Sequence, residues 1–276
     1  MASSFGVRGR RSRALAAATA TAAVLAGLGV AGGTSPEANA SPAPRAAACE
    51  ASGFCDDFES QTGGEPSGRW TVTAENCTGT GTVTVDETEA HSGSRSLRVD
   101  GGGGYCNHVF AGTPLTDLGL QDTVYLRFWV KHSTELPAGH VTFAAMNDAA
   151  DGDRDLRMGG QNGALQWNRE SDDATLPEQS PDGVALSQPL PVNTWTCVEA
   201  RVDQAAGELS TWVDGTLVEG LVVDGEPTHD VDSQWLGRGD WRPSLTDLRL
   251  GWESYGGDTD TLWFDDVAVG GERLGC

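Results

Sequence analysis

Polar and hydrophobic side chains alternate in short segments along most of the chain. In residues 124–132, for example, Leu126, Phe128 and Val130 alternate with more polar neighbours. A period of two residues is typical of β-strands, because successive side chains of a strand point to opposite faces of the sheet. Thirty-seven glycines and frequent turn signals separate such segments, which predicts many strands and almost no helix. The candidate strands are residues 81–85, 96–99, 124–132, 140–146, 164–170, 194–203, 208–218, 245–254 and 261–269.

The candidate at residues 208–218 contains the dipeptide Asp214-Gly215. This dipeptide predicts a β-hairpin, because the tight turn of a hairpin needs left-handed backbone conformations that Asp and Gly adopt easily. The chain has no repeat at the period of a solenoid or a propeller. These features predict an all-β fold, an antiparallel jelly-roll β-sandwich in which one sheet bends into a concave groove.

The N-terminal residues have the pattern of an export signal. Four arginines precede an apolar run rich in Ala and Gly at 14–32, and the Ala-Asn-Ala triplet at 38–40 predicts cleavage after residue 40. The paired arginines at 10 and 11 leave the twin-arginine route open. A membrane anchor is the alternative, which we do not favour because no later segment has the roughly 18 apolar residues that a span needs. We expect a signal peptide over 1–40, a short linker over 41–48 and a single extracellular domain over 49–276.

The charge and the cysteines narrow the partners and the compartment. The formal net charge is -22, and removal of residues 1–40 would make it about -25. A surface this acidic repels nucleic acid and anionic lipid, so we expect neither nucleic acid nor a membrane as a partner. In a secreted protein the six cysteines are expected to form three disulfides, since the compartment is oxidising and no Cys-x-x-Cys metal motif occurs.

The segment 124–132 also carries a candidate sugar-binding surface. Arg127, Trp129 and Lys131 share the face opposite the apolar stripe, and Lys131 is the only lysine of the chain. Aromatic rings suit the C–H face of a sugar, and cations suit its acidic groups. We assign these three side chains to substrate binding, with an ordinary solvated face as the alternative.

Several motifs carry a resemblance to a known family. They are CDDFES, AHSGSRSLRVDGGGGYCNHVF, HVTF, LRMGGQ, NRESDDATLPEQSP, LGWESYGGD and TLWFDD, in this order. Together they resemble the core domain of the cellulose-induced secreted protein of cellulose-degrading filamentous fungi, over nearly all of residues 53–276. The resemblance implies a β-jelly roll similar to glucuronan lyases and, more distantly, to alginate lyases, with polysaccharide lyase activity and a structural calcium ion. It also implies three disulfides, because it pairs Cys77 with Cys106 and Cys197 with Cys276, which leaves Cys49 with Cys55.

A uronan lyase must remove the weakly acidic proton on C5 of a uronic acid. The site therefore has to neutralise the neighbouring carboxylate with cationic or amide donors, which stabilises the enolate-like intermediate. Arg157 and Gln161 share strand parity and are the candidates for this role, the Arg through its charged fork and the Gln through its NH2. Gly159 and Gly160 lie between them and permit a bulge, which would alter that parity.

The reaction also needs a base near C5 and an acid near O4. We assign these roles to Tyr255 and His108 together, and then to His140. A tyrosine base would need a pKa lowered by adjacent cations, which Arg157 could supply. The alternative for each candidate is a packed residue with one hydrogen bond.

Three further residues of this region bear on sugar binding. Arg169 and Asp173 are candidate contacts to sugar hydroxyls, although they could equally pair with each other or cap the following turn. Asp155 stands where the family pattern has a histidine. A carboxylate there could repel a uronate, and the acidity of the whole chain points the same way.

The calcium site that the resemblance implies is built from oxygen ligands. Glu59 and Asp265 would supply carboxylates, and backbone carbonyls near Ser92 and Arg95 would complete the shell. The alternative is two solvated acids. The acidic segment 151–155 resembles a calcium loop superficially, but it lacks the glycine and the final glutamate of that motif, so we expect a mobile acidic loop there.

Two classes of function remain. The first is a secreted polysaccharide lyase that cleaves a uronic-acid polymer, glucuronan before alginate, by β-elimination, and the second is a non-catalytic, lectin-like carbohydrate-binding module. A glycoside hydrolase is not favoured, because Thr175 stands where the second glutamate of a Glu-x-Asp-x-x-Glu pattern belongs. Motifs of serine hydrolases and zinc proteases are also missing. With the family resemblance, we expect a monomeric lyase with a polysaccharide substrate.

Overall fold

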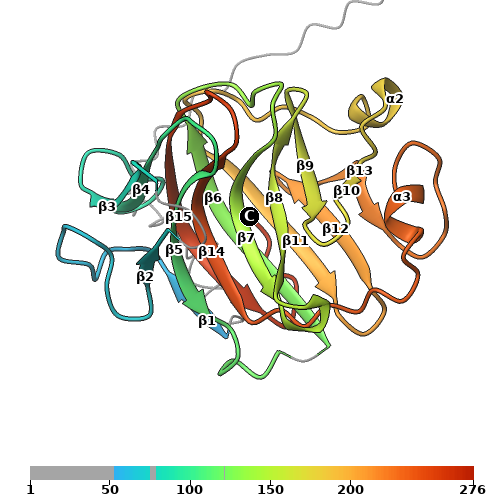
Figure 1. The fold of residues 1–276 in the computed structure, drawn as a ribbon. Helices are drawn as coiled ribbons and strands as arrows, with labels where there is room; N and C mark the ends of the chain where they lie inside the picture. The colour runs from blue at the N-terminus through green and yellow to red at the C-terminus, as the bar shows by residue number, and fades with distance from the viewer. Residues whose placement is uncertain (1–52, 75–78, 121) are drawn as a thin grey trace, which may run out of the picture. The chain divides into compact units, whose positions relative to one another are not determined.

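The computed structural model describes residues 53–74, 79–120 and 122–276. Nearly all regular elements in these ranges are strands, and they form two antiparallel sheets that share one hydrophobic core (Figure 1). The predicted all-β sandwich is therefore confirmed. The predicted signal peptide, the linker and the first residues of the predicted domain lie outside the described residues.

The first sheet, called sheet A, has the strand order β13-β12-β11-β6-β15-β4-β3, with β1 paired to β15. Its strands are β1 (Phe54–Asp56), β3 (Thr82–Asp86), β4 (Ser96–Gly101), β6 (Thr123–His132), β11 (Thr196–Asp203), β12 (Glu208–Val213), β13 (Thr216–Val223) and β15 (Asp260–Gly270).

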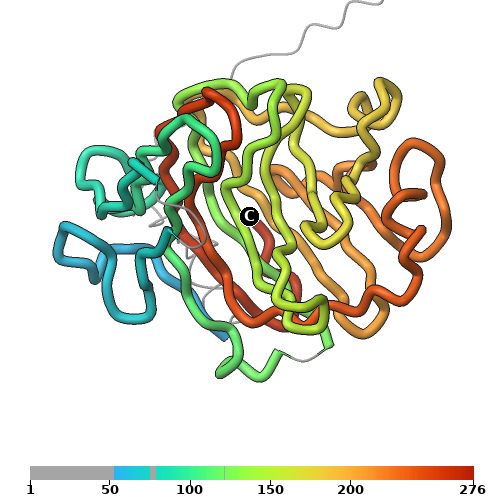
Figure 2. The backbone as a smooth tube through the Cα atoms, viewed as in Figure 1, coloured from blue at the N-terminus to red at the C-terminus, as the bar shows by residue number. Residues whose placement is uncertain are grey.

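The second sheet, called sheet B, has the order β10-β9-β8-β7-β14-β5-β2. Its strands are β2 (Thr71–Thr73), β5 (Asn107–Pro114), β7 (Val141–Asp148), β8 (Arg154–Gln161), β9 (Ala164–Arg169), β10 (Ala174–Leu176) and β14 (Asp247–Ser254). Consecutive strands such as β5 and β6, or β14 and β15, belong to different sheets, and Figure 2 lets the reader follow the chain as it crosses between them. Such crossing is typical of a jelly roll.

The core lies between the two sheets and is built from alternate residues of each strand. Leu126, Phe128 and Val130 of β6 are buried there, and so are Leu250 and Trp252 of β14. Full burial of an aliphatic or phenylalanine side chain contributes about 1.5–3 kcal/mol relative to exposure. Because the odd and even positions of each strand face opposite ways, the residues between these core positions lie on the outer faces of the sheets.

The predicted hairpin is confirmed. Strands β12 and β13 pair directly, and the two residues between them, Asp214 and Gly215, have φ angles of 48° and 77°. Both angles lie in the left-handed region that such a turn requires. The helical elements among the described residues are short: η1 (Ala149–Asp151), α2 (Pro181–Val184) and α3 (Ser233–Leu236). None of the helices in the described ranges is long and apolar enough to cross a membrane.

The prediction of an acidic loop at 151–155 was wrong for its last two residues. Strand β8 begins at Arg154, so Asp155 is a strand residue that pairs with Asn147 of β7. Its backbone N–H donates to a carboxylate oxygen of Glu170 at 2.8 Å. Asp151 lies in η1 and is bound by Arg238. Partners distant in sequence therefore order this segment, and a local charge pattern does not reveal them.

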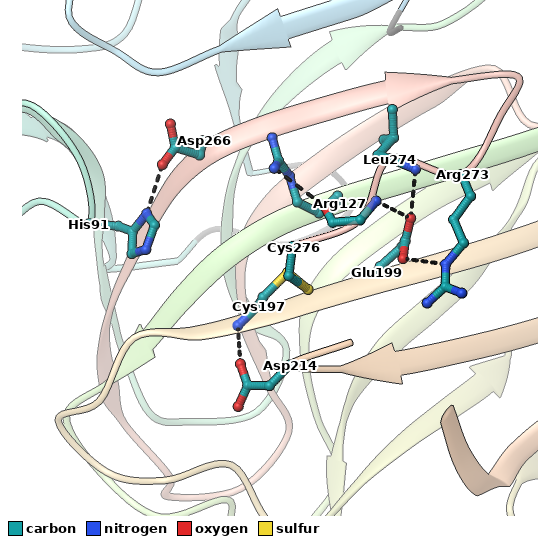
Figure 3. The surroundings of a disulfide bond; sticks show 10 residues. His91, Arg127, Cys197, Glu199, Asp214, Asp266, Arg273, Leu274 and Cys276 are labelled. Carbon is teal, nitrogen blue, oxygen red and sulfur yellow. Dashed lines mark hydrogen bonds and ion pairs between the residues drawn. A yellow bond between two sulfur atoms is a disulfide. The ribbon is translucent and has the colours of Figure 1, made fainter. Parts of the chain in front are cut away.

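One predicted disulfide is confirmed, and it fastens the C-terminal segment to the outer face of sheet A (Figure 3). Cys197 of β11 is bonded to Cys276. Beside this bond, the buried carboxylate of Glu199 accepts hydrogen bonds from the backbone N–H groups of Leu274 at 2.8 Å and of Gly275 at 2.9 Å. Cys55 and Cys106 are also disulfide-bonded. Their predicted partners, Cys49 and Cys77, lie outside the described residues.

Candidate functional site

A row of side chains crosses the outer face of sheet B at right angles to its strands. The register places His108 of β5 opposite Glu253 of β14, and Glu253 opposite Thr142 of β7. It continues with Gly159 of β8 and Gln166 of β9. Residues directly opposite each other in a sheet share a face, and the residues that follow His108 and precede Glu253 belong to the core. The row therefore faces away from the core.

A cleft of about 190 Å³ opens on this face beside the row. Strand β5 contributes His108, β14 contributes Glu253, and β8 contributes Arg157, while Tyr255 lies just beyond the end of β14. Three segments that are far apart in the sequence thus border one small space. Three of them, Arg157, Tyr255 and His108, are among the catalytic candidates of the sequence analysis.

Glu253 lies at the centre of this group and is almost fully buried. One carboxylate oxygen is 3.7 Å from Nη1 of Arg157, and the other is 3.7 Å from Nδ1 of His108. Burial alone would raise the pKa of Glu253, but the contact with His108 and the positive charge of Arg157 outweigh it and lower the pKa below its ordinary value. Glu253 is therefore a carboxylate at neutral pH, and its negative charge attracts Arg157.

Arg157 is a permanent cation between two carboxylates. Its Nη2 lies 2.9 Å from Glu170, and its side chain is 10% exposed. Burial acts to lower the pKa of Arg157, but the charges of Glu253 and Glu170 more than compensate and raise it. Its Nε atom is buried and has no hydrogen-bond partner in the part of the chain that the structure describes. A buried donor without a partner can still be satisfied by a ligand.

Tyr255 is half exposed and carries a neutral phenol. Burial, the negative charge of Glu253 and a hydrogen bond to Glu253 raise the pKa of Tyr255 to about 12, and the opposing effect of Arg157 is smaller. The expectation that Arg157 would lower this pKa enough for a tyrosine base was wrong, because burial and Glu253 raise the pKa by more than the charge of Arg157 lowers it. A phenol with this pKa keeps its proton at neutral pH, so Tyr255 can act as a proton donor but not as a base.

His140 and Gln161 lie at the edge of the same face. His140 immediately precedes β7, and burial lowers its pKa, while Glu253 and Arg157 act on it in opposite directions. Its imidazole is thus neutral at neutral pH. Gln161 is four residues from Arg157 along β8, about 13 Å at the usual strand rise, and its amide donates to Gln179 at 3.2 Å.

The close approach of β8 to β7 explains the glycine between Arg157 and Gln161. A Cβ atom on Gly159 would lie 1.8 Å from the carbonyl oxygen of Val141, which excludes any other residue without a backbone shift. The register irregularity that accompanies this approach lies on the β7 side, while β8 keeps an unbroken register with β9. Arg157 and Gln161 therefore keep the common face that their parity predicts.

The structure separates Arg127, Trp129 and Lys131 from this cleft. Strand β6 belongs to sheet A, so the three side chains lie on the opposite outer face of the sandwich. Arg127 donates to the carbonyl of Gly275 at 3.4 Å, and Lys131 pairs with Glu89 at 2.8 Å. The ring of Trp129 is stacked on an imidazole with a centroid distance of 3.7 Å. Each of these predicted sugar contacts already has a partner within the chain.

Arg169 and Asp173 are not together either. Arg169 is fully buried, with its guanidinium bound to Asp172 at 2.7 Å and stacked on Trp235 at 4.9 Å. It therefore pairs with the neighbour of Asp173 and faces away from the cleft. Asp173 is exposed, with a φ angle of 56°, and its charge acts on His140.

Sequence reasoning missed Glu253, Glu170 and Arg249. Glu253 shares strand parity with Tyr255, which is the one signal that could have identified it. Arg249 binds Asp155 directly and also contacts Asp247 at 3.0 Å. Burial raises the pKa of Asp155, and the charge of Arg249 opposes this shift. Asp155, which stands where the family pattern has a histidine, is thus paired with the guanidinium of Arg249.

The two predicted calcium ligands approach the same turn, residues 91–95, from different sides. Glu59 accepts hydrogen bonds from the N–H groups of Ser94 and Arg95, both at 2.7 Å. Asp265 accepts from the N–H of Ser92 at 3.0 Å, and no group of three or more metal-ligating side chains occurs within the described ranges. Burial and the neighbouring Asp266 raise the pKa of Asp265 to about 7. At neutral pH the carboxyl group of Asp265 is therefore close to its own pKa, and its ionised form accepts hydrogen bonds from the N–H groups of His91 and Ser92.

Comparison with known proteins identifies the family of the chain. A search of curated proteins gave no match. The solved structure described as "Cellulose induced protein, Cip1" is 42% identical, with a TM-score of 0.74, over 81% of this chain and 99% of that chain. An endo-beta-1,4-glucuronan lyase from the fungus Trichoderma reesei is 17% identical, with a TM-score of 0.51, over 80% of this chain and 96% of that one, which supports the fold alone.

A family model described as "Cip1-like, core domain", within the polysaccharide-lyase-like group, matches residues 57–272. This range contains every strand of sheet B and all four residues of the cleft described above. The chain therefore belongs to the Cip1-like core-domain family of polysaccharide-lyase-like proteins.

Proposed function

We propose that the protein is a secreted polysaccharide lyase that cleaves a uronic-acid polymer by β-elimination in the cleft on sheet B. The observation that carries this proposal is the gathering of Arg157, Tyr255 and His108 around one buried carboxylate, Glu253. Arg157 supplies a permanent cation and Tyr255 a neutral phenol, and His140 at the edge of the same face supplies a neutral imidazole. These are the three kinds of side chain that the elimination needs. Membership of a polysaccharide-lyase-like family supports a polysaccharide as the substrate.

The proposed reaction begins with the uronate carboxylate bound to Arg157. A neutral imidazole removes the proton from C5, and the electrons of the C–H bond move onto the carboxylate side as an enolate. These electrons then form the double bond between C4 and C5 while the bond from C4 to the leaving oxygen breaks. Tyr255, which is protonated at neutral pH, donates its proton to that oxygen.

Of the two histidines, His140 is the better candidate for the base. The lowered pKa of His140 keeps the ring free of a proton in neutral solution, and the ring is partly exposed. His108 is more deeply buried, and its Nδ1 faces Glu253. In this proposal His108 positions Glu253, which in turn holds Arg157 and Tyr255.

A non-catalytic sugar-binding module is the second candidate. It is favoured by the two carboxylates that already contact Arg157, since they reduce the attraction of this cation for a uronate. The module would use the same cleft and the same contacts, but no proton would move.

Incubation with glucuronan, alginate and a neutral glucan separates the two candidates. We expect the ultraviolet absorbance of an unsaturated uronate to appear with a uronan and not with the neutral glucan. Binding of a glycan without new absorbance would contradict the lyase and support the module. New reducing ends without absorbance would indicate hydrolysis and contradict both.

We also propose that calcium stabilises the fold at the turn 91–95. Calcium prefers oxygen ligands. Glu59, three residues after the end of β1, and Asp265 of β15 both contact this turn through their carboxylates. Excess calcium should raise the melting temperature relative to a chelator, because a ligand that binds only the folded state stabilises it. The variant Glu59→Gln should lose this calcium response, whereas Glu65→Gln, at another exposed acid, should keep it. An unchanged melting temperature in calcium and in chelator would contradict the site.

A further inference from the structure

The cleft borders a second hollow beyond Arg157, called here the adjoining pocket. Arg154, Asp155, Glu170 and Arg249 line both spaces, so the two are direct neighbours. The adjoining pocket is the larger of the two, with a volume of about 480 Å³. Its other lining residues are Asn147, Gly152, Asp153, Thr246 and Asp247.

The adjoining pocket carries an excess of negative charge. Its four carboxylates outnumber its two guanidinium groups, which gives a formal charge of -2; the carboxylates are Asp153, Asp155, Glu170 and Asp247. The arginines are already matched, because Arg249 contacts both Asp155 and Asp247, and Arg154 lies 3.4 Å from Glu170. No positive charge in this pocket is left to attract a second acidic sugar.

The cleft around Glu253 differs in charge. Its lining includes three arginines and three carboxylates, so that its formal charge is zero, and Arg157 provides a donor atom without a partner in the described ranges. A uronate placed against Arg157 thus meets a balanced environment. A uronate one sugar further along would meet a pocket with a net formal charge of -2, whereas the hydroxyls of an uncharged sugar could donate to the same carboxylates.

We infer that the substrate is a heteropolymer in which an acidic sugar alternates with an uncharged one, and not a homopolymer of uronates. This inference rests on the proposed function, because it takes the Arg157 cleft as the uronate site. The adjoining pocket then selects the sugar next to the cleaved unit. The charge of the whole chain, -22, acts in the same direction, since an alternating polymer carries about half the charge of a uronan of equal length.

The test compares glucuronan with two alternating polymers, hyaluronan and unsulfated chondroitin, in which glucuronate alternates with an uncharged amino sugar. Wild-type protein should give a kcat/KM at least tenfold higher on one of the alternating polymers. The double variant Asp153→Asn, Asp247→Asn removes both excess charges, and Asn tolerates the left-handed φ of 57° at position 153. It should raise kcat/KM on glucuronan about fivefold at low salt, and less at high salt.

The matched control is the double variant Glu219→Gln, Glu226→Gln, which removes two exposed charges away from the cleft. In this control the ratio of kcat/KM on glucuronan to kcat/KM on the alternating polymer should equal the wild-type ratio. Equal or faster cleavage of glucuronan by the wild type would overturn the inference, and so would a double variant at 153 and 247 that changes both substrates alike. If no polymer yields the unsaturated product, the lyase proposal fails; calorimetric binding of the same polymers then decides the inference, which equal affinities would overturn.

Discussion

Replacement of Tyr255 with Phe should lower kcat for elimination about a thousandfold, because the phenol is the proposed donor to the leaving oxygen and a positioned acid contributes 10²- to 10⁴-fold. The variant removes one oxygen atom from a half-exposed side chain, so the melting temperature should stay close to that of the wild type. Initial rates of ultraviolet absorbance on the best uronate polymer measure the loss. KM should change little, since Arg157 and not the phenol is assigned to the carboxylate.

Tyr105→Phe is the matched control. The ring of Tyr105 is exposed and lies 5.7 Å from that of Tyr255 in an edge-to-face arrangement, but no reaction step is assigned to it. Its rate should equal the wild-type rate. The pH profile adds a second readout: because the pKa of Tyr255 is raised from 10.0 to about 12, the wild-type rate should not decline on the alkaline side near pH 10. A Tyr255→Phe protein with more than a tenth of the wild-type kcat would contradict the assignment.

Removal of the C-terminal disulfide should give the largest loss of stability. The bond between Cys197 and Cys276 closes a loop with a sequence separation of 79, and the loss of chain entropy in the unfolded state then corresponds to about 4.5 kcal/mol at 25 °C. The double variant Cys197→Ser, Cys276→Ser removes the link without leaving a free thiol. Urea unfolding followed by tryptophan fluorescence measures the difference in unfolding free energy.

The hydrogen bonds of Glu199 provide the control for this experiment. Glu199→Gln keeps the disulfide but weakens the contacts to the N–H groups of Leu274 and Gly275, and burial without full pairing should cost about 1–3 kcal/mol. The disulfide variant should therefore be the less stable of the two. If the double serine variant lost less than 1 kcal/mol of unfolding free energy, this would contradict the stabilisation of about 4.5 kcal/mol that we attribute to closure of the loop.

Strand parity predicted which side chains share a face but not which sheet bears them. In residues 124–132 the alternation correctly separates Arg127, Trp129 and Lys131 from the core side of β6. Nothing in that alternation says that β6 lies in sheet A while β8 lies in sheet B, because strand order depends on contacts between distant segments. A predicted sugar surface and the cleft thus came to lie on opposite sides of the sandwich.

The candidate site was predictable in part for a similar reason. The family motifs identified Arg157, Tyr255 and His108, and the structure brings these three together. Glu253 escaped notice because its role arises only when β5, β8 and β14 lie near one another, although Arg157 and Glu253 have a sequence separation of 96. The same central carboxylate reversed the expected direction of the pKa of Tyr255.

The docking of residues 273–276 has a practical consequence for immobilising the protein. The terminal Cys276 is fixed on sheet A, whereas the cleft opens on the outer face of sheet B. A tether or a fused partner attached behind this cysteine would leave from the far side of the sandwich. Protein anchored to a bead or sensor in this way would keep its cleft accessible to long polymers in solution.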